Sequence, residues 1–125
     1  MINVLLVDDY ALIRQCIRDL LKKETERINV VGECSNGKEV LPFLETNKVD
    51  VILMDCNMPL QNGIETTKQV KQRYPEIKVI GLSMNDDLFT QESFFKNGAD
   101  GFLSKSKFEI EELISAINEP IISKI

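Results

Sequence analysis

The sequence predicts an α/β protein with a doubly wound, five-stranded parallel sheet that carries helices on both faces. Short apolar runs alternate along the chain with segments whose apolar residues recur at helical spacing. Five strand–helix units in this order favour a parallel sheet with right-handed crossovers. The 125 residues suit one domain, and an apolar fraction of 43% is typical of a globular protein with a hydrophobic core.

The first half of the chain predicts three strands and two helices. The strands are Ile2 to Val7, Ile28 to Gly32, and Val51 to Met54. The last of these is apolar without a break, which is typical of a strand buried on both faces. Apolar positions at helical spacing predict the two helices, the first through Leu12, Ile13, Cys16, Ile17, Leu20 and Leu21, the second through Val40, Leu41 and Leu44.

The second half predicts two more strands, Val79 to Leu82 and Gly101 to Ser104. Gly63 precedes a third helix that ends before Pro75, because the residue before a proline disfavours helical geometry. Asp86 or Asp87 could cap a fourth helix that ends near Asn97 and Gly98. The last helix contains Ile110, Leu113, Ile114 and Ile117 and ends at Pro120. We therefore expect a domain over residues 1–120, with 121–125 as a tail or the start of a linker.

Composition narrows the classes of function. The net charge of −5 and the pI of about 4.8 disfavour direct binding to nucleic acid or to anionic membranes. No apolar run reaches transmembrane length and no signal-peptide pattern is present, so we expect a cytoplasmic protein. Cys16, Cys34 and Cys56 form no paired motif and are predicted to be small buried hydrophobic residues in a reducing compartment. The chain has no histidine, so any phosphohistidine must belong to another protein.

Polar side chains follow four of the five predicted strands. They are Asp8 and Asp9 after the first strand, Asp55 after the third, Ser83 after the fourth and Lys105 after the fifth. Because parallel strands end at one edge of a sheet, we expect these groups to lie together. Taken singly, Asp9 is typical of a helix cap, Ser83 of a strand-end hydroxyl and Lys105 of a solvated lysine. Only their coincidence at one edge favours a functional site.

Three neighbouring carboxylates need compensation, since each pair at contact repels by about 1 kcal/mol even in water. An all-oxygen site suits Mg²⁺ or Mn²⁺. Lys105 is suited to a phosphoryl oxygen, and Ser83 supplies a hydroxyl donor. An aspartate can itself be a nucleophile that forms an acyl phosphate. The residues therefore predict a phosphoryl-transfer site.

The motifs resemble those of response-regulator receiver domains of two-component signalling, over about Ile2 to Pro120. They are Val7-Asp8-Asp9, Met54-Asp55-x-Asn57-Met58-Pro59-x-x-x-Gly63, Leu82-Ser83 and Gly101-Phe102-Leu103-x-Lys105. Further segments resemble the NarL/FixJ-type transcription regulators, which have a helix-turn-helix output domain: Val30-Val31-Gly32-Glu33, Asn36-Gly37, Gly63-Ile64-Glu65 and Ser83-Met84-x-Asp86-Asp87. The resemblance implies a flavodoxin-like (βα)5 fold with strand order 2-1-3-4-5.

The resemblance also implies a role for each site residue. Asp55 would accept a phosphoryl group from a sensor histidine kinase or a phosphotransfer protein. Asp9 and Asp55 would bind Mg²⁺ through side-chain oxygens, Asn57 through its main-chain carbonyl and Asp8 through water. Lys105 would pair with the phosphoryl group.

Two residues would then carry the signal outward. Ser83 would move to hydrogen-bond the phosphoryl group, and Phe102 would change rotamer in step. The domain would be a signalling module that catalyses only its own phosphoryl transfer and dephosphorylation. It would bind no membrane, would reach DNA only through an output domain outside these residues, and could form a homodimer on phosphorylation.

Three other functions remain open from the residues alone. A stand-alone or phosphorylation-independent receiver would act only by docking to proteins. A phosphohydrolase of the haloacid-dehalogenase type also uses aspartate and Mg²⁺. The resemblance to that family would imply an Asp-x-Asp pattern after the strand, whereas this chain has Asp55-Cys56-Asn57. A flavodoxin-like flavin binder should carry a phosphate loop rich in Ser, Thr and Gly where this chain has Asp8-Asp9.

Overall fold

The computed structural model describes residues 1–24, 26–84 and 87–119, which contain a five-stranded parallel sheet in the order β2-β1-β3-β4-β5. The strands are β1 (Ile2–Val7), β2 (Ile28–Cys34), β3 (Val51–Met54), β4 (Lys78–Ser83) and β5 (Gly101–Ser104). The predicted fold class and strand order are confirmed. Because all neighbouring strands pair in parallel, their carboxyl ends meet at one edge of the sheet.

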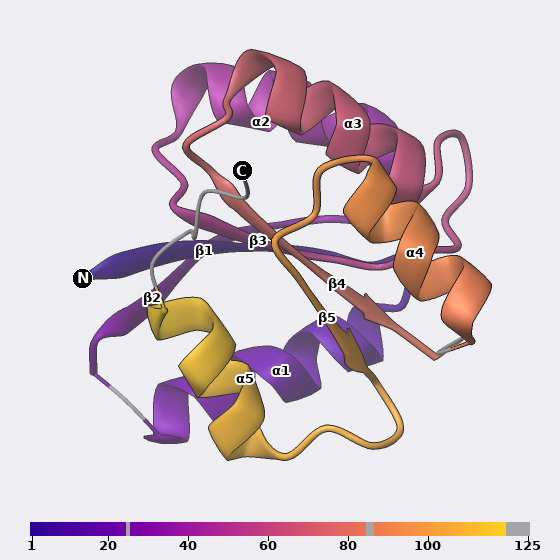
Figure 1. The fold of residues 1–125 in the computed structure, drawn as a ribbon. Coiled ribbons are helices and arrows are strands. Elements are labelled where there is room, and N and C mark those ends of the chain that lie inside the picture. The colour runs from indigo at the N-terminus through magenta and orange to yellow at the C-terminus, as the bar shows by residue number, and fades with distance from the viewer. Residues whose placement is uncertain (25, 85–86, 120–125) are drawn as a thin grey trace.

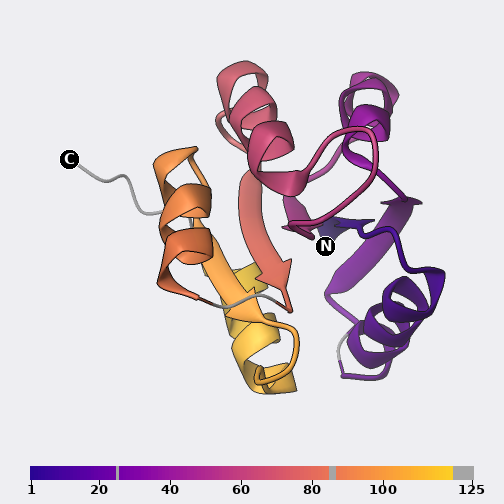
Figure 2. The same ribbon diagram turned by 90° about the vertical axis from the view of Figure 1, so that its right-hand side faces the viewer.

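Helices cover both faces of the sheet (Figures 1 and 2). On one face lie α1 (Ala11–Glu24) and α5 (Ile110–Asn118), and on the other lie α2 (Val40–Thr46), α3 (Gly63–Arg73) and α4 (Leu88–Lys96). A short 3-10 helix, η1 (Gly37–Glu39), leads into α2. None of the helices in the described ranges combines the length and the apolar character needed to cross a membrane.

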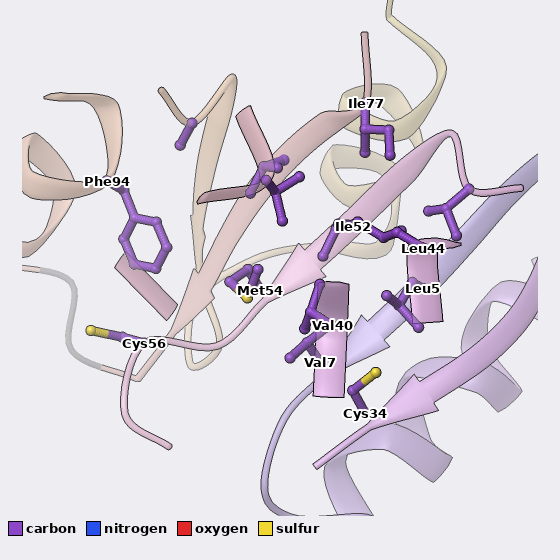
Figure 3. Close-up of a cluster of buried hydrophobic side chains, with 14 residues drawn as sticks. Leu5, Val7, Cys34, Val40, Leu44, Ile52, Met54, Cys56, Ile77 and Phe94 are labelled. Carbon is purple, nitrogen blue, oxygen red and sulfur yellow. The ribbon is translucent and has the colours of Figure 1, made fainter. Parts of the chain in front are cut away.

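The core has two layers because the central strands bury both of their faces. Along β3, Ile52 and Met54 pack under α2, α3 and α4, whereas Val51 and Leu53 pack under α1 and α5. The first of these layers is shown in Figure 3. This alternation explains the unbroken apolar run, since every side chain of β3 meets a helix layer.

Strand β2 is longer than predicted. It continues past Gly32 to Cys34, and its pairing with β1 shifts between Val4 and Leu5, so that Val4 lies opposite Val30 and Leu5 opposite Gly32. The bulge takes up Val31 and lets the strand continue. Gly32 is needed there because a Cβ atom at this position would lie 2.4 Å from the ring of Phe43.

The apolar stripe predicted for α1 is wider than its buried face. Ile17 and Leu21 are buried, but Leu12 is 74% exposed and Cys16 and Leu20 are also exposed. Residues four apart share one side of a helix, so Leu12, Cys16 and Leu20 form a row turned away from the sheet. The prediction that Cys16 is buried is therefore wrong, whereas the burial of Cys34 and Cys56 is confirmed.

Helix starts agree with the capping signals in the sequence. Asp87 is the N-cap of α4, and its Oδ1 accepts a hydrogen bond from the Thr90 N–H at 2.7 Å. Asn62 caps α3 in the same way, so Gly63 is the first residue of that helix rather than the residue before it. Asp86, Pro120 and the predicted tail 121–125 lie outside the described residues.

At the amino edge of the sheet, the buried Lys78 connects β4 to the end of α5. Its Nζ donates to the carbonyl oxygens of Ala116 at 2.7 Å and Ile117 at 3.2 Å, and also to that of Glu119. These carbonyls have no partner within the helix, so the lysine caps the carboxyl end of α5.

Candidate functional site

The polar residues after the strands do meet at the carboxyl edge of the sheet. Val7 pairs with Met54 in the β1–β3 ladder, so Asp8 and Asp55 leave neighbouring strands side by side. The main-chain N–H of Asp55 donates to the Val7 carbonyl at 2.9 Å, which continues the ladder beyond the last apolar residue.

Lys105 bridges two of the carboxylates. Its Nζ donates to Asp8 Oδ2 and, at 3.0 Å, to Asp55 Oδ1, and its main-chain N–H donates to the Ser83 carbonyl at 2.9 Å. The Lys105 side chain is only 7% exposed. Burial alone would lower the pKa of Lys105, but the hydrogen bonds and charges of Asp8 and Asp55 outweigh it and raise the pKa. The ammonium therefore remains charged and holds the two strand ends together.

Asp55 is a buried carboxyl whose pKa lies above the ordinary value for an aspartate. Burial raises the pKa of Asp55 to about 6, because the hydrogen bond and charge of Lys105 offset desolvation only in part and the nearby Asp8 charge adds to it. Its Oδ1 also accepts the main-chain N–H of Cys56 at 2.9 Å. Asp55 is therefore ionised at neutral pH.

Asp9 has a carboxylate oxygen without a hydrogen-bond partner among the described residues. This oxygen, Oδ1, is buried. One carboxylate oxygen from each of Asp8, Asp9 and Asp55 lies within 4.8 Å of the others. Three carboxylates face one ammonium, and an unpaired buried oxygen costs free energy. A hard divalent cation of the Mg²⁺ or Mn²⁺ type fits this donor set, because it prefers oxygen ligands and neutralises the excess charge.

Gly63 allows the β3–α3 loop to fold back onto Asp55. Its N–H donates to the Cys56 carbonyl at 2.8 Å, and a Cβ atom on Gly63 would lie 1.7 Å from the Asp55 carbonyl oxygen. At the tip of the loop Leu60 has a φ of 69°, which is uncommon for a residue other than glycine. Asn57, in the same loop, is exposed.

Ser83 and Phe102 lie on neighbouring strands, but only Ser83 is at the carboxyl end of its strand, where the carboxylates lie. Ser83 is buried at the end of β4. Phe102 is partly buried in β5 opposite Gly81, and its ring lies 5.7 Å from the ring of Phe94 at 53°. A Cβ atom on Gly81 would lie 2.9 Å from the Phe102 ring, so the missing side chain leaves room for this ring pair. Phe102 is the second residue of β5, two residues before Ser104 at the end of that strand.

Sequence reasoning missed Arg14 and Glu33. From α1, Arg14 donates to the main-chain carbonyl of Asp8 and, through Nε, to Glu33 Oε1 at 2.7 Å. The available signal was an arginine shortly after the Asp8-Asp9 pair, together with a glutamate that follows the apolar pair Val30-Val31 and Gly32.

Comparison with known proteins agrees with this geometry. The family model described as "Response regulator receiver domain" matches residues 4–118. The chain is 40% identical over 117 residues to the response regulator UvrY of Escherichia coli K12, covering 94% of this chain and 53% of UvrY. It is 38% identical over 116 residues to the transcriptional regulatory protein DegU of Brevibacillus brevis, covering 93% of this chain and 48% of DegU. The chain thus spans about half the length of these curated relatives.

Solved structures show the same fold. The response regulator domain of Thermotoga maritima CheB has a TM-score of 0.86 at 30% identity, and the match covers 97% of this chain and 96% of that one. A LuxR-family two-component response regulator from Aurantimonas sp. SI85-9A1 has a TM-score of 0.85 at 27% identity, covering 92% of this chain and 81% of that one.

Proposed function

Because this chain belongs to the response regulator receiver domains, and within them to the NarL/FixJ type, we propose that Asp55 accepts a phosphoryl group from a partner protein's phosphohistidine. The observation that carries the proposal is the contact of Lys105 with both Asp8 and Asp55, beside an Asp9 oxygen without a partner. The Lys105 ammonium, the ionised Asp55 carboxylate and a set of carboxylate oxygens that suits a divalent cation are the parts that phosphoryl transfer needs.

The described residues fit a divalent cation. Asp9 and Asp55 would hold Mg²⁺ through side-chain oxygens, Asn57 through its main-chain carbonyl and Asp8 through a water molecule. When bound, the cation neutralises charge that develops on the phosphoryl oxygens. The unpartnered Asp9 oxygen supports this assignment because nothing within the described residues otherwise compensates it.

The transfer is a displacement at phosphorus. A carboxylate oxygen of Asp55 forms the new O–P bond as the N–P bond to the donor imidazole breaks. The bonding electrons leave with that nitrogen, which takes up a proton, and the product is an acyl phosphate. The Lys105 ammonium then donates to a phosphoryl oxygen in place of the Asp55 carboxylate oxygen.

The same proposal extends to the response. The Ser83 hydroxyl turns to donate to the phosphoryl group, and Phe102 changes rotamer beside Phe94. Phosphorylation thereby biases a two-state surface formed by α4, β5 and α5. Phe102 lies opposite Gly81, two residues before Ser83 on the adjacent strand, and this arrangement supports the coupling.

We also propose a wider role for the domain in signalling. The domain acts as a signalling module whose only chemistry is its own phosphorylation and dephosphorylation. It takes its phosphoryl group from a sensor histidine kinase or phosphotransfer protein in the cytoplasm, forms a homodimer on phosphorylation, and controls transcription through an output domain outside these residues. The names of the DegU and UvrY relatives, and their roughly doubled length, support this role.

The test is phosphorylation by acetyl phosphate with Mg²⁺, followed by intact-protein mass spectrometry. Wild type should gain one phosphoryl group, and Asp55→Asn should gain none. Asp50→Asn is the matched control, because Asp50 lies at the other end of β3, where it accepts the Asn3 N–H at 2.8 Å. Equal yields for wild type and Asp55→Asn would contradict the assignment. An unmodified wild type would favour a phosphorylation-independent docking module, and turnover of small phosphomonoesters would favour a phosphohydrolase.

A further inference from the structure

Arg14 joins the turn after β1 to strand β2. From α1, its guanidinium donates through Nη1 to the main-chain carbonyl of Asp8 and through Nε to Glu33 Oε1 at 2.7 Å. The arginine side chain is 16% exposed. A guanidinium is planar and rigid, so two acceptors held by one group are fixed relative to each other.

The carbonyl that Arg14 contacts lies between the two acidic residues. The C=O of Asp8 and the N–H of Asp9 belong to one planar peptide group. The Asp8 N–H donates to the Cys34 carbonyl at 3.0 Å, and Asp8 Oδ1 accepts the Tyr10 N–H at 2.9 Å. With Arg14 on the carbonyl, the main chain of Asp8 is held on both sides. The hydrogen bond therefore sets the plane from which the Asp9 side chain departs.

Glu33 makes this arrangement compatible with a cation site. An uncompensated guanidinium beside the carboxylates would repel a metal ion, but Glu33 pairs with it. Burial would raise the pKa of Glu33, yet the hydrogen bonds and charges of Arg14 and Arg18 outweigh burial and lower it. The carboxylate therefore stays ionised at neutral pH, and Arg14 acts on the turn through geometry more than through net charge.

Arg14 also borders the same internal space as the acidic residues. A cavity of about 10 Å³, the size of one water molecule, is lined by Asp8, Arg14 and Asp55 together with apolar residues of β1, α1, β3 and β4. The arginine therefore lies directly behind the site and not on the outer surface of α1.

From these contacts we propose that Arg14 is a positioning residue for cation binding, which orients the Asp8–Asp9 peptide so that the unpartnered Asp9 oxygen faces the metal. The inference rests on the proposed function. It adds a residue outside the carboxylates and Lys105 to the machinery of phosphorylation. Glu33 also belongs to this arrangement, because it orients the Arg14 guanidinium and offsets part of its charge.

Arg18 provides a matched control within the same helix. One turn after Arg14, it donates to Glu33 Oε2 through Nε at 3.0 Å and Nη2 at 2.8 Å. Its side chain is 34% exposed. Arg18 carries the same charge as Arg14 and contacts the same glutamate. The hydrogen bond to the Asp8 carbonyl, however, comes from Arg14.

The experiment measures Mg²⁺ affinity of the full 125-residue chain by titration, followed through the Asp9 amide NMR signal. Arg14→Ala should weaken Mg²⁺ binding by about 10-fold, as loss of an outer-shell contact does in other metal sites, while Arg18→Ala stays within about twofold of wild type. Arg14→Lys keeps the charge but cannot bridge both acceptors, so its affinity should fall between these two.

A second measurement separates positioning from general loss of structure. The rate of phosphorylation by acetyl phosphate is recorded against Mg²⁺ concentration. In Arg14→Ala the half-saturating concentration should rise while the maximal rate is retained, whereas partial unfolding would lower the rate at every concentration. If Arg14→Ala does not fold, Arg14→Lys carries the test.

The outcomes are distinct. Equal Mg²⁺ affinity in the Arg14 and Arg18 variants overturns the inference and leaves the proposed function intact. A reduced maximal rate with unchanged Mg²⁺ dependence overturns it as well. A wild type that binds Mg²⁺ but takes no phosphoryl group overturns the proposed function, while the affinity comparison still decides the role of Arg14.

Discussion

The Cα of Gly63 lies so close to the Asp55 carbonyl that a methyl group on it would be 1.7 Å from the carbonyl oxygen. The loop that begins at Asp55 therefore returns to touch its own first residue, and the Gly63 N–H closes it on the Cys56 carbonyl at 2.8 Å. This contact fixes the position of Asp55 from its main chain, independently of Lys105.

Gly63→Ala should destabilise the fold strongly. The clash is with the main-chain carbonyl of Asp55, directly after β3, which cannot move without disturbing the hydrogen bond from the Asp55 N–H to Val7. We therefore expect a loss of about 3 kcal/mol or more in the free energy of unfolding. Urea denaturation followed by circular dichroism measures it. Gly101→Ala is the control, because its Cβ would meet Ile80 at an ordinary 3.7 Å. Similar losses in the two variants would contradict the importance of the close approach.

Asp55→Asn should stabilise the Mg²⁺-free protein at neutral pH. The pKa of Asp55 is raised from 3.8 to about 6 by burial, so between these values the folded state binds more protons than the unfolded state. Stability therefore falls as the pH rises from 4 to 6, at a cost of up to about 3 kcal/mol. The variant lacks this loss, and its advantage over wild type should grow through that window and then level off. Parallel pH curves of unfolding free energy would contradict this.

Lys105→Met should leave Asp8 and Asp55 facing each other without a counter-charge. The pKa of Asp55 should rise further, and removal of one partner of this buried pair should cost about 3 kcal/mol at pH 7. The loss should shrink as the pH falls from the raised pKa of the variant's Asp55 to about 6, because the variant takes up a proton there before wild type does. NMR titration of the Asp55 carboxyl carbon and urea denaturation measure both effects. Lys107→Met, on the exposed segment that follows, should leave the pKa of Asp55 unchanged.

Lys78→Met should loosen the end of α5. Without the ammonium, the carbonyls of Ala116, Ile117 and Glu119 lose their donor, and we expect a cost of about 2 kcal/mol. Amide hydrogen exchange should accelerate in the last turn of α5 and not in β1. Lys71→Met is the control, since it breaks the 2.9 Å pair with Asp100 at the same sheet edge without a contact to α5. Equal acceleration in both variants would rule out a specific cap.

The bounds of β3 and the convergence of the strand-end side chains at one sheet edge were both predictable from the sequence. An apolar run bounded by Asp50 and Asp55 leaves little choice of strand limits, and the observed strand is Val51–Met54. Once the alternation of strands and helices requires a parallel sheet, every residue just after a strand must lie at one edge. The convergence of Asp8, Asp55 and Lys105 follows from topology alone.

The sequence could not predict features that depend on how elements meet. Six apolar positions on α1 did not show which row faces the sheet, so Cys16 was wrongly placed in the core. The end of β2 was predicted too early because its continuation depends on a bulge against β1. The Arg14 contact depends on the reach of a long side chain from α1 to both the Asp8 turn and β2, and hydrophobic periodicity contains no signal for that.

The bond between Lys105 and Asp8 joins positions that are 97 residues apart. A ribosome therefore completes β1 and β3 long before it adds the positive charge that belongs between their ends. A nascent chain that pairs only these two strands holds like charges face to face, which opposes early closure of that edge. The arrival of β5 removes the repulsion. We therefore expect the sheet to close at this edge only after β5 has been synthesised.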